Sequence, residues 1–207
     1  MKINNPLDKI LGNEVKIKIL RFFIKTGAKW NGRQIAKEIG VTPATSHKAL
    51  QGLYKEGVLS LENIGKTHLY NLNSENYVVS SLLEPLFDKE GKILNNIIAI
   101  IKKNIISAGL REHIVSIVLF GSVSLRKDTS KSDIDLAVIV RDQKSLRAVE
   151  ALFEKVDHKI SAEFGNVISA YINTTAEFKA KHKEGLDIVN NILKANTLIY
   201  GRQIEKI

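Results

Sequence analysis

The chain has 207 residues and a formal net charge of +9 at neutral pH; 44% of its residues are hydrophobic, 26% are charged and none is cysteine. These values exclude a disordered or collagen-like chain, a disulfide framework and a cysteine-ligated zinc site. The longest apolar run, residues 97–101, is far shorter than the roughly 20 residues needed to cross a bilayer, and the N-terminus carries no secretory pattern, so we expect a cytoplasmic protein without a membrane partner.

Three helices are predicted at the start of the chain. Apolar residues recur at helical spacing over residues 13–26, where an asparagine is placed to cap the first turn. A second helix covers residues 31–39 and ends at Gly40, which can adopt the left-handed conformation of a helix C-cap. Thr42 and the proline after it begin a third helix, which Gly57 ends. The short connection between the last two helices predicts a helix-turn-helix.

A basic hairpin is predicted after the third helix. Residues 58–61 and 68–72 have the pattern of strands, and residues 63–66 join them through a glycine that can adopt the positive φ of a hairpin turn. Residues 74–89 form a predicted connecting helix. Gly91 marks a domain boundary. We therefore expect a first domain over 1–73, a connecting segment over 74–91 and a second domain over 92–207.

The second domain alternates strand and helix patterns, which predicts an α/β (α+β) fold. Its first element is a long amphipathic helix over residues 92–108. The segment at Tyr200 and Gly201 is interpreted as a simple end to the last helix. The remaining predicted strands cover 114–120, 133–140 and 167–172, and the remaining predicted helices cover 145–163, 175–182 and 186–195.

The excess of positive charge lies in the first third of the chain. Residues 1–72 hold 12 basic and 5 acidic side chains. In a helix-turn-helix the second helix enters the major groove of DNA, and donors near its start reach base edges and phosphates. The residues placed for such contacts are Thr45, His47, Lys48, Gln51 and Lys55 on the third helix, with Lys66 and His68 at the hairpin tip.

The first domain resembles the winged helix-turn-helix domains of bacterial and archaeal transcriptional regulators. The resemblance rests on residues 34–57 and the hairpin that follows them. It implies double-stranded DNA as a partner and, by analogy with regulators that pair across a two-fold axis, a homodimer. A winged helix that contacts proteins, or one with a purely structural role, is the alternative.

Two carboxylates follow a glycine-serine turn in the second domain. The strand at 114–120 leads into Gly121 and Ser122, and Asp133 and Asp135 begin the next strand about ten residues later. Alternation along a strand places both aspartates on one face, where they repel each other unless a cation neutralises them. Carboxylate oxygens suit Mg²⁺, and the glycine lets a phosphate approach the backbone closely. The pattern predicts metal-assisted phosphoryl or nucleotidyl transfer.

Residues 120–138 resemble the motif of the polymerase-beta-type nucleotidyltransferase superfamily, in particular its minimal members. The resemblance implies a small mixed sheet flanked by helices, a nucleoside triphosphate ligand, expected to be ATP, and transfer of AMP to an unknown acceptor, which can be a protein. It also implies catalytic and magnesium-binding roles for Asp133 and Asp135. The nucleotide-binding set consists of Gly121, Ser122, Arg126 and Ser132.

Two departures from the family pattern leave a second hypothesis open. Minimal members carry a small residue, a basic residue and a glycine where this chain has Ser124, Leu125 and Arg126. Active members also place a third carboxylate on the next strand, whereas residues 165–172 contain no acid. The chain is therefore expected to be either a nucleotidyltransferase fused to a DNA-binding domain, or a DNA-binding transcriptional regulator whose degenerate transferase-like domain senses a nucleotide or mediates assembly without catalysis.

Overall fold

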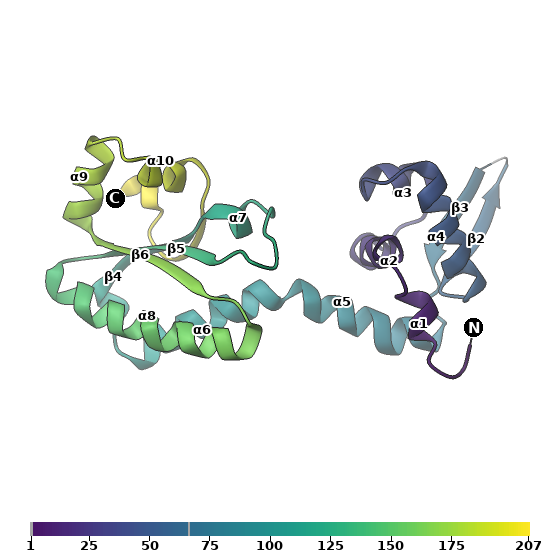
Figure 1. The fold of residues 1–207 in the computed structure, drawn as a ribbon, viewed down its shortest axis with the longest axis horizontal. Coiled ribbons are helices and arrows are strands. Elements are labelled where there is room, and N and C mark those ends of the chain that lie inside the picture. The colour runs from purple at the N-terminus through teal and green to yellow at the C-terminus, as the bar shows by residue number, and fades with distance from the viewer. Residues whose placement is uncertain (1, 66) are drawn as a thin grey trace. The chain divides into compact units, whose positions relative to one another are not determined.

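The computed structural model describes residues 2–65 and 67–207 and divides into two compact units, residues 1–93 and 94–207 (Figure 1). Both units contain helices and a small sheet, which confirms the predicted mixed α+β class. None of the helices in the described ranges combines the length and the apolar character that a bilayer-spanning segment requires.

Two helices of the first unit begin at the predicted capping residues and a third is followed by the predicted left-handed glycine, whereas residues 74–76, predicted to start the connecting helix, form a turn. The Asn13 side chain accepts a hydrogen bond from the Lys16 N–H at 2.9 Å, and the Thr42 hydroxyl accepts one from the Thr45 N–H at 3.2 Å. Gly40 has the expected left-handed φ of +68°. Only the single turn α1 was not expected from the sequence. The helices are α1 (Leu7–Ile10), α2 (Glu14–Thr26), α3 (Gly32–Glu38), α4 (Pro43–Lys55) and α5 (Glu84–Gly91), the last preceded by a π-helical turn at Val79–Leu83.

A three-stranded antiparallel sheet completes the winged helix-turn-helix. Strand β3 (Thr67–Leu72) lies between β1 (Trp30–Asn31) and β2 (Leu59–Ile64). Strand β1 has only two residues, too few for a pattern in the sequence to reveal. The hairpin turn contains Gly65 at φ +58°, as predicted, while Lys66 lies outside the described residues. Helices α3 and α4 followed by the β2–β3 hairpin form the predicted helix-turn-helix and wing.

The segment predicted to connect the domains packs into the first unit. Val79, Leu83 and Phe87 are buried in the same apolar cluster as the residues of α2 and α4. Arg21 of α2 donates two hydrogen bonds to the carboxylate of Glu90 in α5, at 2.7 and 2.8 Å. These contacts fix the segment against the helix-turn-helix, so it contributes to the stability of that unit.

Leu83→Ala tests this packing. The side chain is fully buried, so the substitution is expected to lower the free energy of unfolding of the first unit by about 2–5 kcal/mol. The adjacent Leu82→Ala is the matched control: its side chain is 42% exposed, and its loss should cost less than about 1 kcal/mol. Urea titration followed by the fluorescence of Trp30, the single tryptophan of the chain, reports on this unit. Equal losses of unfolding free energy in the two variants would contradict the burial of this segment in the core of the first unit.

The second unit is a four-stranded mixed sheet covered by helices on both faces, as the family resemblance implied. The strand order is β6-β5-β4-β7, in which β5 and β6 are parallel and the other pairs antiparallel. One face of the sheet packs on α6 and α8, and the other packs on α9 and α10 (Figure 1). The strands are β4 (Ile114–Leu119), β5 (Ile134–Val140), β6 (Ile168–Thr174) and β7 (Thr197–Gly201), and the helices are α6 (Ile93–Ser107), α7 (Gly121–Ser124), α8 (Gln143–Phe164), α9 (Thr175–Lys183) and α10 (Asp187–Lys194).

Strand β7 corrects the interpretation of the end of the chain. Tyr200 and Gly201 do not simply follow the last helix, because they belong to a strand that pairs antiparallel with β4. Gly201, at φ +80°, lies so close to β4 that a Cβ there would be 2.2 Å from the carbonyl oxygen of Val115. A five-residue strand whose partner lies some 80 residues earlier leaves little local signal in the sequence.

Candidate active site and nucleic-acid interface

The turn after β4 brings the backbone of Gly121 against the side chain of Asp135. Gly121 has φ +70°, and a Cβ at this position would lie 2.1 Å from Oδ2 of Asp135. The preceding N–H, of Phe120, donates a hydrogen bond to the backbone carbonyl of Asp135 at 3.0 Å. Only glycine fits both the conformation and the space, so the turn and the carboxylate are positioned together.

Asp133 and Asp135 interact, although they are not both in the strand. Strand β5 begins at Ile134, so the prediction that it begins at Asp133 is wrong by one residue, and Asp133 lies exposed immediately before it. Partial burial raises the pKa of Asp135, and the negative charge of Asp133 raises it further. The two carboxylates are therefore close enough to repel each other.

The raised pKa of Asp135 has a consequence for stability. Because the folded chain holds this proton more tightly than the unfolded chain does, the contribution of Asp135 to stability is largest at low pH. It is lost as the pH rises through the unfolded and then the folded pKa. At neutral pH the ionised pair destabilises the ligand-free unit, and a cation between the carboxylates would relieve that cost.

The donor set fits a magnesium ion that shares its coordination with a substrate. Among the described residues, no group of three or more histidine, cysteine, aspartate or glutamate side chains could hold a metal ion by itself. Magnesium commonly uses one or two carboxylates and completes its shell with water and phosphate oxygens. Asp133 and Asp135 supply that number of hard oxygen ligands, so the protein would form only part of the coordination shell.

The loop between α7 and β5 holds the other predicted nucleotide-binding residues. Arg126 is exposed and has a φ of +55°, a left-handed conformation that glycine adopts more easily. It therefore combines the sequence position of the family glycine with a backbone conformation that favours glycine. The Ser132 hydroxyl accepts a hydrogen bond from the Thr129 N–H at 2.9 Å, which closes the loop. Ser122 is half-buried beside Gly121, at the start of a helix of only four residues.

A serine occupies the position beside Asp135 on the neighbouring strand. In the parallel pairing of β5 with β6, Asp135 is in register with Ser169, which is exposed. Residues in register on neighbouring strands point to the same face of the sheet. Strand β6 itself carries no carboxylate, so the position nearest to the aspartate pair bears a hydroxyl instead of an acid.

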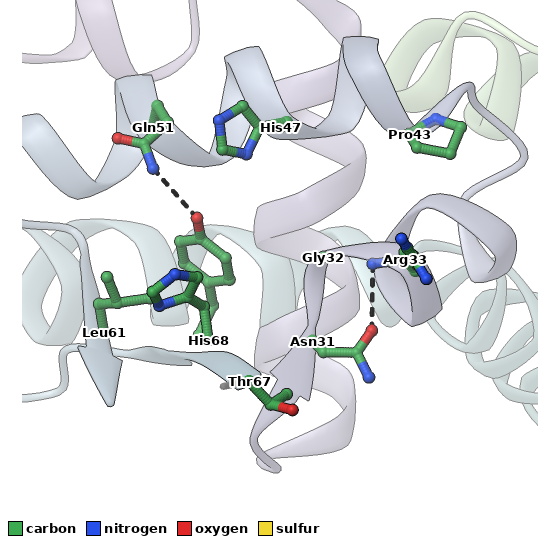
Figure 2. Close-up of a pocket in the computed structure, with 10 residues that line it drawn as sticks. Asn31, Gly32, Arg33, Pro43, His47, Gln51, Leu61, Thr67 and His68 are labelled. Atoms are coloured by element: carbon green, nitrogen blue, oxygen red, sulfur yellow. Dashed lines mark hydrogen bonds between the residues drawn. The ribbon is translucent and has the colours of Figure 1, made fainter. Parts of the chain in front are cut away.

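The first unit contains a cleft of about 630 Å³ between the helix-turn-helix and the wing, lined by both polar and apolar groups. Figure 2 shows His47 and Gln51 of α4 facing the strands that carry His68. The side-chain amide of Gln51 donates a hydrogen bond to the hydroxyl of Tyr70 at 3.2 Å. The structure thus brings these three predicted residues together, along with Arg33 of α3, which was not predicted.

Three other predicted DNA-binding residues lie outside this cleft. Thr45, Lys48 and Lys55 are exposed on α4, and none of them lines the cleft. Arg33 was missed because it belongs to the first helix of the helix-turn-helix, and only the tertiary fold brings it near the wing. The sequence gives only a weak signal for Arg33, which is a basic residue in the first turn of a helix. Asn31 caps that helix, and its side chain accepts hydrogen bonds from the N–H groups of Arg33 and Gln34.

Gly121→Ala tests the contact between the turn and Asp135. The left-handed φ alone is expected to cost about 1–2 kcal/mol, and the collision with Asp135 adds to that cost and displaces the carboxylate. Gly165→Ala is the matched control, since Gly165 has φ +75° but no atom within 4 Å of its Cβ position. Thermal unfolding and the NMR-detected titration of Asp135 measure the two effects. An unchanged Asp135 titration in Gly121→Ala would refute the proposed contact.

Comparison with solved structures returned winged-helix regulators for the N-terminal part of the chain. The transcriptional repressor BigR from Xylella fastidiosa is 18% identical, covering 40% of this chain and 81% of its own, with a TM-score of 0.35. A homodimeric winged helix-turn-helix DNA-binding domain from Mycobacterium bovis is 20% identical, covering 44% and 81%, with a TM-score of 0.37. HlyU from Vibrio cholerae is 16% identical, covering 44% and 96%, with a TM-score of 0.36. At these scores, the winged-helix assignment rests on the chain's own elements.

The second unit matches a protein family directly. No curated protein matched the chain. The family model described as polymerase beta, nucleotidyltransferase matches residues 95–205, which include Gly121, both aspartates and all four strands of the mixed sheet. Since this match spans more than half of the 207 residues, the chain belongs to the polymerase beta nucleotidyltransferase family.

Proposed function

We propose that the protein is a Mg²⁺-dependent nucleotidyltransferase that moves AMP from ATP to an unknown acceptor, which can be a protein, and that its winged helix binds double-stranded DNA. The observation that carries the enzymatic proposal is the carboxylate of Asp135 held against Gly121 and beside Asp133. This arrangement is unfavourable in the absence of a cation, and the family membership of the unit supplies a chemical use for it.

The proposed roles are those that the resemblance to the family implies for these residues. Gly121 and Ser122 hold the β and γ phosphates, Arg126 and Ser132 complete the nucleotide site, and the two aspartates hold the metal. A bound magnesium ion would neutralise charge on the triphosphate. The oxygen of an acceptor hydroxyl forms a bond to the α-phosphorus and its proton passes to solvent, while the bond from that phosphorus to the bridging oxygen of the β-phosphate breaks and pyrophosphate leaves.

A second candidate function is favoured by Ser169. A serine in register with Asp135 supplies no carboxylate to bind a second metal or to accept a proton from the acceptor. In this alternative the protein is a DNA-binding regulator whose second unit binds Mg²⁺ and a nucleotide as a signal and transfers nothing.

Incubation with α-labelled ATP, Mg²⁺ and cell extract distinguishes the two functions. Transfer predicts a labelled acceptor and released pyrophosphate. Asp133→Asn or Asp135→Asn should abolish both, because each removes a charged ligand while keeping the side-chain shape. Asp128→Asn is the matched control, an exposed carboxylate in the preceding loop that should retain activity. ATP binding without labelling supports the regulator, and the absence of both binding and labelling contradicts both candidates.

Arg126→Gly separates stability from nucleotide binding. Relief of the left-handed strain, about 1–2 kcal/mol, outweighs the roughly 0.5–1 kcal/mol of added chain entropy, so the variant is expected to be up to about 1.5 kcal/mol more stable. If Arg126 contacts the triphosphate, the same variant binds Mg²⁺-ATP more weakly by calorimetry. A variant that is stabilised but binds with unchanged affinity would remove Arg126 from the site.

The DNA-binding proposal rests on the exposed basic face of α4 and the charge of the first unit. Duplex DNA should bind with an affinity that falls steeply with salt, because phosphate contacts release counterions. Lys48→Ala should weaken binding and reduce the salt slope by about one ion, whereas Lys103→Ala, an exposed lysine on α6, should do neither. Equal effects of the two variants would indicate attraction by overall charge, without a specific interface.

A further inference from the structure

The cleft between α4 and the wing presents donors without a competing acid. Among the described residues that line it, none carries a carboxylate. Arg33 contributes a guanidinium, and His47, His68 and Thr67 contribute further polar groups from three separate segments of the fold (Figure 2). A concave surface that combines a cation, imidazoles and hydroxyls is suited to a phosphate group.

The Arg33 guanidinium is available for a ligand. None of the ion pairs or side-chain hydrogen bonds in the described part of the chain involves the Arg33 guanidinium; the hydrogen bond to the Asn31 side chain is donated by the backbone N–H of Arg33. Some exposed cations of the same unit are paired, as Arg21 is with Glu90 and Lys29 with Glu62, whereas Arg33, like Lys37 and Lys48, is in none of the ion pairs among the described residues. Arg33 therefore brings uncompensated positive charge to the cleft.

Helix α4 directs two different faces outward. Pro43, His47 and Gln51 recur every four residues and all line the cleft. Lys55 continues this row one turn farther along the helix but does not line the cleft, and Lys48, one residue beyond His47, is exposed and does not line it either. Residues four apart lie on the same face of a helix, so the cleft face is distinct from the face that carries Lys48.

We propose that the cleft is a phosphate-binding site in which Arg33 provides the charge and His47 and His68 provide hydrogen bonds from opposite walls. Because Nδ1 of His68 is hydrogen-bonded to the side chain of Asn63, His68 would contact the phosphate through Nε2. The phosphate can come from the backbone of duplex DNA or from a free phosphate-bearing molecule, and the experiment below separates these sources. The DNA arm rests on the DNA binding proposed above, whereas the free-phosphate arm is independent of it.

In the DNA arm, the full-length protein is titrated with duplex DNA at several salt concentrations. Arg33→Ala is expected to weaken binding roughly tenfold and to lower the salt slope by about one ion, uniformly across duplex sequences, because a backbone phosphate carries no sequence information. Arg33→Lys should retain the salt slope. Lys37→Ala is the matched control, since it removes one exposed positive charge from the same helix outside the cleft.

In the second arm, inorganic phosphate is added without DNA, and the imidazole NMR signals of His47 and His68 are followed. Shifts of both signals that are lost in Arg33→Ala support a site for free phosphate. Failure of all duplexes to bind, with these shifts present, would overturn the DNA-binding function and keep the cleft as a phosphate site. DNA binding that is equal in the wild type, Arg33→Ala and Lys37→Ala, with no phosphate-dependent shifts, would overturn the cleft site and leave the DNA-binding function intact.

Discussion

The packing of the Asp135 carboxylate against the Cα of Gly121 is the contact on which the candidate active site depends. It joins the end of β4 to the start of β5, and the hydrogen bond from the Phe120 N–H to the Asp135 carbonyl fixes the same two segments through the backbone. The contact has a cost, because it partly buries a carboxylate beside the charge of Asp133. Sites that bind cations or anions commonly retain such local instability, and the surrounding structure compensates for it.

The compensation comes from the apolar layers on the two faces of the sheet. Residues of β5 alternate between them: Leu136 and Val138 face the cluster with α6 and α8, while Ala137 and Ile139 face the cluster with α9 and α10. All four side chains are fully buried. A strand held on both faces positions the aspartates at its start far more rigidly than a surface loop would.

In the first unit, the residues that stabilise the fold and the residues proposed to bind anions lie on opposite sides of the same helices. The buried side of α4, with Leu50 and Leu53, belongs to a core that also includes the segment before α5. The outward sides of α3 and α4 carry cations and hydrogen-bond donors. Removing an outward cation should therefore change the binding of anions while leaving the core intact.

The sequence by itself determined the features that depend on near neighbours. The caps at Asn13 and Thr42 and the left-handed Gly40 were predicted because a helix end is decided within a few residues. The two motifs likewise identified both units, because their residues are close together in the chain.

Tertiary structure alone decided the contacts between distant segments. Residues 197–201 form strand β7 because they pair with β4. Arg33 lines the cleft only because the wing folds back beside α3. The collision that requires glycine at position 121 involves a side chain 14 residues later, and Ser169 is set beside Asp135 by strand pairing across a long helix. Such contacts depend on how packed elements meet in space, which local spacing does not encode.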